Sequence, residues 1–312
     1  MCGLFGFLNL GKEKDYSKLI NTLATNASIR GTHATGISYN LKNELIIYKK
    51  PLPAHKMNFK HFSGVKCITG HTRHATQGDY KTNRNNHPFK GKTEQERFAL
   101  AHNGIIYNDK ALQKSESLPK SSIITDSYVM VQLLEKEKAL TFDNIARVTE
   151  KLEGYYTFTI LDNKNNLYIV KGDSPISIIR LTKSNLIVYA STDEILYKAL
   201  LEAGMFDEII NKQFEIIDAD EGDILKISSS GEITKGYFKP FEYTYNFKNW
   251  YEYGILSDIS PDSESDYYDN IVSIAKSFGY CQEDIDELLL DGYTLEEIEE
   301  YIYTGEEYAY NF

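Results

Sequence analysis

The first six residues, Met1-Cys2-Gly3-Leu4-Phe5-Gly6, place a thiol at the start of the chain. If Met1 is removed, Cys2 carries its thiol and a free α-amine on one carbon, so the nucleophile has its own base. The amine titrates near pH 7.7–8.0 and the thiol near 8.5, so at roughly neutral pH the amine can accept the thiol's proton. These six residues are equally compatible with an accident of the start codon, so the rest of the chain must decide.

The composition indicates a globular protein. The 42% of hydrophobic residues among 312 is ample for a packed core. No apolar run of about eighteen residues predicts a membrane span, and no basic and apolar leader predicts secretion, so we expect a cytoplasmic protein. The odd set Cys2, Cys67 and Cys281 offers neither a disulfide framework nor metal-ligand spacing. We therefore expect no metal and no cofactor.

Charge divides the chain into two chemically different parts. Residues 241–312 hold 18 acidic residues against Lys248 and Lys276, a balance of −16, and the whole chain carries −11, which leaves +5 for residues 1–240. We expect a first domain at 1–240, a linker or extended segment at 241–265, and a small acidic helical module at 266–312. Apolar spacing predicts three helices in the last part, at 269–278, 282–290 and 294–303.

Short apolar runs bounded by Gly, Asn or Asp dominate the first 240 residues and predict strands. The expected strands are 36–41, 45–48, 66–70, 98–102, 156–161, 167–171, 176–181, 186–190, 214–218 and 223–227. Helical periodicity appears at 15–28, 126–137, 142–152 and 194–203. The pattern predicts a sheet-dominated α/β domain with helices covering two faces.

Three polar segments are hard to explain as scaffold. Residues 71–78 put imidazole, guanidinium and hydroxyl groups directly after an apolar strand, where functional loops tend to lie. A second polar cluster occupies 85–89, and a His-Asn-Gly turn interrupts the apolar run at 100–106. Each segment alone is a weak indication of a site.

Together with Cys2, the order of the short motifs resembles class II glutamine amidotransferase domains, most closely the glutaminase domain of glucosamine-6-phosphate synthase. The matching motifs are Cys2 to Gly6, Arg30-Gly31, Gly70-His71-Thr72-Arg73, Ala75-Thr76, His87-Pro88, His102-Asn103-Gly104 and Thr125-Asp126. The resemblance covers about the first 235 residues and implies an N-terminal-nucleophile (Ntn) hydrolase fold, a four-layer α/β/β/α sandwich.

The resemblance also implies roles. Cys2 is the expected nucleophile, and the Asn103 side-chain nitrogen and Gly104 backbone N–H are the expected oxyanion donors. Arg73 is the expected partner of the α-carboxylate of L-glutamine, since a guanidinium binds a carboxylate in a bidentate manner, and Asp126 is the expected partner of the α-ammonium. The implied reaction is hydrolysis to glutamate and ammonia through a γ-glutamyl thioester.

Thr76 and His87 are expected to line and orient the pocket. For His87 a structural loop role is an equal alternative. Arg73 could instead pair with a structural carboxylate, and Asp126 could cap the following helix.

Three positions depart from the family pattern. His74 stands where Trp is common, Gln77 where His is common, and His33 where Asp is common. A weaker aromatic shield over the pocket and altered packing around residue 33 are the expected consequences.

The last 72 residues contain no phosphate-binding glycine loop and no metal cluster that could form an acceptor site. We therefore expect a separate ammonia-accepting synthase or synthetase. The acidic module is either a solvated cap on its own small core or a docking element for a basic partner, and mimicry of nucleic acid is the least favoured interpretation. The expected core residues are Ile271, Ile274, Phe278, Ile285, Leu288, Leu289 and Ile298. An Ntn amidohydrolase acting on another amide and a catalytically silent glutamine-binding regulator remain alternatives.

Overall fold

The computed structural model describes residues 2–241, 268, 271–272, 275–276, 280–290, 293–295, 298 and 302. The chain divides into two compact units, Met1–Glu242 and Tyr243–Phe312. In the described ranges, no helix has the length and apolar character needed to cross a membrane. The predicted linker at 241–265 lies outside the described residues from residue 242 onward.

Two antiparallel sheets form the first unit. The seven-stranded sheet, called sheet A, has the order β11-β9-β10-β1-β4-β2-β3. Its strands are β1 (Gly3–Asn9), β2 (Ala34–Leu41), β3 (Glu44–Lys50), β4 (Cys67–Arg73), β9 (Ser177–Leu181), β10 (Leu186–Ala190) and β11 (Phe214–Ile216). The six-stranded sheet, called sheet B, has the order β13-β12-β8-β7-β6-β5. Its strands are β5 (Phe89–Lys92), β6 (Arg97–Ile106), β7 (Gly154–Asp162), β8 (Leu167–Lys171), β12 (Asp223–Ile227) and β13 (Ile233–Tyr237).

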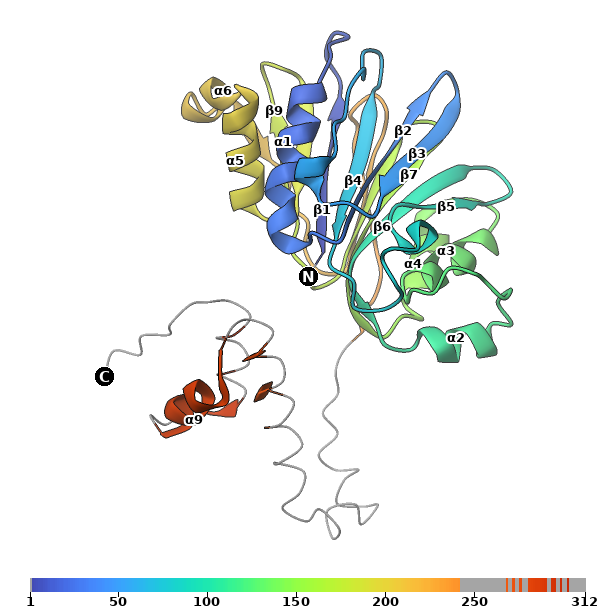
Figure 1. Cartoon of the computed structure of the whole chain (residues 1–312). Helices are drawn as coiled ribbons and strands as arrows, with labels where there is room; N and C mark the ends of the chain where they lie inside the picture. Colours follow the sequence, from blue (N-terminus) through green and yellow to red (C-terminus); the bar gives the residue numbers. More distant parts are fainter. Residues whose placement is uncertain are drawn as a thin grey trace. The chain divides into compact units, whose positions relative to one another are not determined.

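Helices lie on the outer faces of the two sheets (Figure 1). Those of the first unit are α1 (Ser17–Ala27), α2 (Asp109–Ser115), α3 (Tyr128–Glu135), α4 (Phe142–Thr149), α5 (Asp193–Ala203) and α6 (Phe206–Ile210). Three short 3₁₀ helices are η1 (Ser28–Arg30), η2 (Ala54–Lys56) and η3 (Asn83–Asn85). All ten predicted strands and all four helices predicted in this unit have counterparts, whereas β1, β5, β13, α2 and α6 were not predicted.

Side chains of β1 point alternately into two different apolar cores, one on each face of sheet A. Phe5 and Phe7 join the core beneath α1 and α5. Leu4 and Leu8 belong instead to the core between the sheets. Successive strand side chains point to opposite faces, so a strand that is apolar at both sets of positions must be covered on both sides.

Strand β6 alternates in the same way, and this sets the distance between the sheets. Phe98 and Leu100 pack with the helices on the outer face of sheet B. Ala99 and Ala101 point into the core between the sheets, where their small side chains favour a close approach of β6 to β1 and β4. The result is the predicted four-layer α/β/β/α sandwich.

In the second unit, the structure describes α9 (Gln282–Leu290) in full. Of the predicted core, Ile271, Ile285 and Ile298 are buried in one apolar cluster, while Ile274 and Phe278 lie outside the described residues. Only parts of the predicted helices at 269–278 and 294–303 are described. The described residues thus show a helix and a small apolar core.

Gly70 provides a test of the packing in sheet A. It pairs with Phe5, whose ring lies so close that a Cβ at position 70 would be 2.2 Å from a ring carbon. Gly70→Ala should lower the free energy of unfolding by about 1–3 kcal/mol, the usual cost of overpacking a core. Urea denaturation measures this loss.

The exposed β5 residue Lys90 serves as the control, and Lys90→Ala should change stability by less than about 0.5 kcal/mol. Combining Gly70→Ala with Phe5→Leu should recover part of the loss. Strict additivity of the two substitutions would contradict the contact.

Candidate active site

Cys2 is held just before the first residue of β1. Gly3 pairs with Thr72, and a Cβ on Gly3 would lie 2.5 Å from the Thr72 hydroxyl oxygen, so only glycine fits there. The Cys2 Sγ lies 3.4 Å from the His74 carbonyl oxygen, to which it donates, and Arg30 Nε donates to the Cys2 carbonyl oxygen at 2.8 Å. Burial raises the pKa of the Cys2 thiol, so the thiol needs a base to become a nucleophile.

Arg73 is a buried cation whose hydrogen-bond partners are neutral. Its Nη1 donates to Asn86 Oδ1 at 2.8 Å, and its Nη2 donates to the carbonyl oxygens of Gln77 and Gly78. No ion pair found in the described ranges includes Arg73. The guanidinium therefore has no carboxylate within ion-pair distance in the described ranges, and its charge suits a carboxylate ligand.

Electrostatic interactions place Arg73 near two other predicted site residues. Burial lowers the pKa of Arg73, while the charges of Cys2 and Asp126 act in the opposite direction. Charges influence a pKa strongly only over short distances. The nucleophile, the cation and the carboxylate therefore form one electrostatic cluster.

Asn103 and Gly104 lie near the end of β6. Asn103 is 1% exposed, and its Nδ2 has no hydrogen-bond partner among the described atoms. Gly104 has a φ of +136°, and a Cβ there would lie 1.9 Å from the Tyr155 carbonyl oxygen. A buried amide donor next to a required glycine is the arrangement expected of a pair of oxyanion donors.

A hydrogen bond between the sheets connects these residues with Arg73. His71 Nε2 lies 2.9 Å from the His102 carbonyl oxygen. His71 precedes Arg73 by two residues, and His102 immediately precedes Asn103. Burial lowers the pKa of His71 to about 3, so a neutral ring donates its Nε2–H to that carbonyl.

Asp126 reaches back toward β6. Its Oδ2 accepts a hydrogen bond from the Ile106 N–H at 2.8 Å, and Ser127, which caps α3, makes no side-chain capping bond. Ser127 Oγ also lies 2.8 Å from Nδ1 of His102. The Asp126 side chain is thus bonded to the strand that carries Asn103, and helix capping does not account for its position.

The two predicted pocket residues lie in different environments. Thr76 is exposed on the loop after β4. His87 is buried between the rings of His71 and Phe89, at centroid distances of 4.2 and 4.3 Å. Neither ring nitrogen of His87 has a partner in the described part of the chain. Substrate contact by Thr76 and His87 stays a prediction.

Sequence reasoning missed the residues that support this cluster. Asn86 bonds to Arg73, Ser127 bonds to Asp126, and the His71 ring bonds to the His102 carbonyl next to Asn103, but none of the three was predicted as part of the site. Asn86 could have been suspected, because it lies in the polar segment 85–89. The contacts of His71 and Ser127 depend on how the sheets pack, and no local pattern reveals them.

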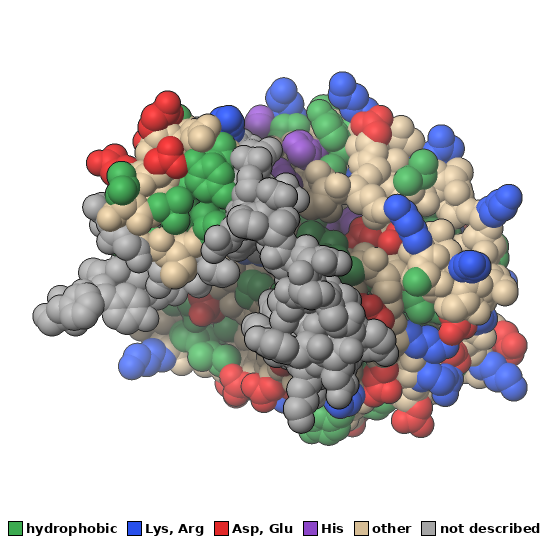
Figure 2. Space-filling view, turned by 90° about the horizontal axis from the view of Figure 1, so that it is seen from below, with side chains coloured by type: hydrophobic (Ala, Val, Ile, Leu, Met, Phe, Trp, Pro, Cys, Tyr) green, Lys and Arg blue, Asp and Glu red, His purple; other side chains and the backbone are tan. Residues whose placement is uncertain are grey.

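Histidine side chains gather on the face shown in Figure 2. No group of three or more His, Cys, Asp or Glu side chains within the described ranges could hold a metal ion. The described residues therefore provide no candidate metal centre.

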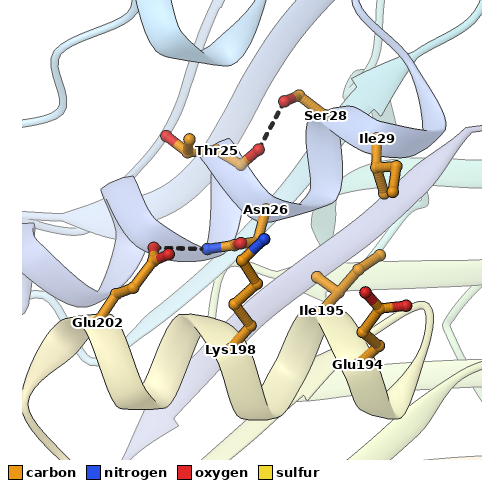
Figure 3. Close-up of a pocket in the computed structure, with 8 residues that line it drawn as sticks. All are labelled: Thr25, Asn26, Ser28, Ile29, Glu194, Ile195, Lys198 and Glu202. Carbon is orange, nitrogen blue, oxygen red and sulfur yellow. Dashed lines mark hydrogen bonds between the residues drawn. The ribbon is translucent and has the colours of Figure 1, made fainter.

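A surface pocket of about 380 Å³ lies between α1 and α5 (Figure 3). It is lined by Thr25, Asn26, Ser28, Ile29, Glu194, Ile195, Lys198 and Glu202. A hydrogen bond of 2.8 Å from Asn26 to Glu202 joins the two helices. None of the predicted site residues lines this pocket, so we do not assign it to the predicted chemistry.

Comparison with solved structures confirms the class of fold. The B. subtilis glutamine phosphoribosylpyrophosphate amidotransferase in complex with ADP and GMP matches with a TM-score of 0.60 and 21% identity, over 76% of this chain and 49% of that chain. A structure described as the allosteric regulatory enzyme of purine biosynthesis gives a TM-score of 0.58 at 21% identity over the same shares. The chain therefore has the Ntn-type sandwich fold.

Sequence comparison identifies the domain. Residues 71–198 match the family of glutamine amidotransferase domains. Glutamine–fructose-6-phosphate aminotransferase from Bacillus thuringiensis is 32% identical over 57% of this chain, and the Listeria monocytogenes enzyme is 31% identical over 77%. The chain spans only 30% and 39% of those two relatives. The chain thus contains a class II glutamine amidotransferase domain.

The buried histidines make the stability of this domain depend on pH. Burial lowers the pKa values of His71, His87 and His102. The unfolded chain therefore binds more protons than the folded chain below about pH 6.5, and the free energy of unfolding should fall as the pH drops. Denaturant titrations over a pH series measure this loss.

The variant His71→Gln keeps a donor for the His102 carbonyl but does not titrate, so its stability should depend less steeply on pH. The exposed His55 provides the control, and His55→Gln should keep the wild-type slope. Equal slopes for His71→Gln and wild type would contradict a neutral, buried His71.

Proposed function

We propose that this chain hydrolyses L-glutamine to glutamate and ammonia, with Cys2 as the nucleophile. The main support is the cluster in which the buried Arg73 guanidinium and the Asp126 carboxylate both act electrostatically on Cys2. A thiol that is influenced by both a cation and an anion suits a substrate with an α-carboxylate, an α-ammonium and a reactive amide.

Arg73 and Asp126 are proposed to recognise the two charged groups of glutamine. The guanidinium is already oriented by Asn86 and by two carbonyl oxygens, so little side-chain freedom is lost on binding. The Asp126 Oδ2 accepts from the Ile106 N–H at 2.8 Å and its Oδ1 accepts from Ser127 Oγ at 3.4 Å, and each carboxylate oxygen can accept a further bond. An amide that lacked these two charges would leave both groups uncompensated.

The proposed reaction needs the free amine of Cys2 after removal of Met1. The amine takes the proton from Sγ, and the thiolate attacks the amide carbon of glutamine. The oxyanion is stabilised by Asn103 Nδ2 and the Gly104 N–H. The carbon–nitrogen bond then breaks, ammonia leaves with the proton returned by the amine, and a γ-glutamyl thioester remains.

Hydrolysis of the thioester completes the cycle. The amine of Cys2 takes a proton from an attacking water, the oxygen bonds to the acyl carbon, and the carbon–sulfur bond breaks as Sγ regains a proton. Glutamate is released and the free enzyme is restored. A reduced thiol is required throughout, which fits the predicted cytoplasmic location.

We further propose that a separate synthase or synthetase accepts the ammonia. The relatives are named glutamine–fructose-6-phosphate aminotransferases, and that name includes an acceptor besides glutamine. In the acidic module, the exposed acidic residues Glu283, Asp284, Asp286 and Glu287 lie along α9 beside an exposed Leu290. This surface supports docking to a basic partner with a small apolar contact.

Cys2→Ala tests the proposed nucleophile. Removing the thiol should abolish glutamine hydrolysis, measured as glutamate released by a purified chain whose intact mass shows loss of Met1. Cys281→Ala, at an exposed cysteine of the second unit, should keep the wild-type rate. Unchanged turnover by Cys2→Ala would rule out the mechanism, and hydrolysis of another amide but not glutamine would reassign the substrate.

Asn103→Ala tests the proposed oxyanion donor. Loss of one such donor raises the barrier by about 2.7–4 kcal/mol, so kcat should fall about 10²- to 10³-fold while KM changes little. Steady-state kinetics with glutamine measure both constants. A matched substitution, Asn83→Ala, removes an amide that bonds to the Lys49 carbonyl and should leave kcat close to wild type. A main effect of Asn103→Ala on KM would contradict the assigned role.

A further inference from the structure

His33 holds the loop that follows β4 through two hydrogen bonds. The His33 backbone N–H donates to the Arg73 carbonyl oxygen at 2.9 Å. The Ala75 backbone N–H donates to Nδ1 of the His33 ring, also at 2.9 Å. Arg73 and Ala75 are the neighbours of His74 in the chain, so the two bonds from His33 fix the backbone on both sides of His74 at the start of the loop.

The His33 ring also contacts both ends of this loop, residues 74–80. It stacks on His74 at a centroid distance of 4.9 Å with planes 23° apart, and on Tyr80 at 4.6 Å with planes 14° apart. The three rings form a continuous stack with His33 in the middle. The stack closes the loop through His33.

The closed loop supplies contacts to two residues of the proposed reaction. The carbonyl oxygens of Gln77 and Gly78 accept hydrogen bonds from Arg73 Nη2, and the His74 carbonyl oxygen lies 3.4 Å from Cys2 Sγ. A shift of the loop would therefore change the orientation of the guanidinium without any change in Arg73 itself.

The Ala75 bond exists only while Nδ1 of His33 is unprotonated. A neutral imidazole accepts through one nitrogen, whereas a protonated ring carries N–H donors on both. Protonation of His33 would thus place two N–H groups against each other and remove the bond that fixes Ala75.

We propose that His33 is a positioning residue whose neutral ring holds loop 74–80 closed, and that protonation of His33 opens this loop and weakens glutamine binding. The inference rests on the proposed function, because it assigns glutamine to Arg73.

The groups around His33 determine the pH at which its ring is protonated. Burial, and then the positive charge of Arg73, lower the pKa of His33. The stacked His74 ring also has a lowered pKa, through burial and the positive charge of His33, and Tyr80 is the other ring that faces His33. The His33 ring is therefore neutral and the loop closed at neutral pH, and the loop opens at a pH below the ordinary pKa of histidine.

Glutamine affinity of Cys2→Ala chains tests the inference without turnover. Calorimetry from about pH 7.5 to about pH 5 should show a Kd that rises roughly three- to tenfold, as expected for a lost hydrogen bond. Adding His33→Asn, which keeps an acceptor but cannot titrate, should remove this rise. Adding His33→Phe, which keeps a stacking ring but has no acceptor, should give a raised Kd at every pH.

Two readouts separate this inference from the proposed function. In an NMR titration, the Ala75 amide resonance should report His33 protonation in the parent chain and in the His55→Asn control, but not in His33→Asn. A pH-independent Kd, or the same rise in His33→Asn as in the parent, would overturn the inference. Lack of turnover by the wild-type chain, with glutamine affinity still dependent on His33, would overturn the proposed hydrolysis and leave the inference standing.

Discussion

The hydrogen bond between the His71 ring and the His102 carbonyl is the constraint on which the site depends, because it ties two strands of different sheets together where their functional residues emerge. Arg73 follows on one strand and Asn103 on the other. The small side chains at Ala99 and Ala101 favour the close packing that this bond requires. A carbonyl acceptor also requires a ring nitrogen that carries hydrogen, and burial keeps the His71 ring neutral with one such nitrogen. The geometry of the site therefore depends on both the packing of the two sheets and the protonation state of His71.

The sequence predicted the sandwich well where apolar and polar positions alternate or where turn residues bound an apolar run. The strand β1, which begins the chain, was not predicted. Residues 3–9 are buried on both faces and show no alternation of apolar and polar residues. The sequence analysis predicted a role for Cys2 but no strand in the residues that follow it. The strands β5 and β13 are short or mostly exposed at their edges, so their local signals were weak. In the structure, β1, β5 and β13 each pair with a strand that was predicted from the sequence.

The candidate site was predictable as a set of residues but not as a set of contacts. Ordered motifs pointed to Cys2, Arg73 and Asn103, whereas the support of Arg73 by Asn86 depends on tertiary packing. The departures from the family pattern were expected to weaken an aromatic shield and to alter packing around residue 33. The structure shows that two of them contact each other, since the ring of His33 stacks on that of His74. A pair of changes that looks unrelated in sequence is thus a single packing unit.

Several buried polar groups of the first unit are in an energetically costly state, and this supports the proposal that the site binds a zwitterion. A buried cation with only neutral partners and a buried amide without a partner each lose hydration that folding does not fully replace. Such costs persist only where the surrounding fold fixes the groups, as the carbonyl oxygens of Gln77 and Gly78 fix Arg73. A bound carboxylate would compensate the guanidinium, and a developing oxyanion would engage Asn103. Because the Asn103 amide would gain its partner only as negative charge develops on the substrate oxygen, it would stabilise the transition state more than the bound substrate.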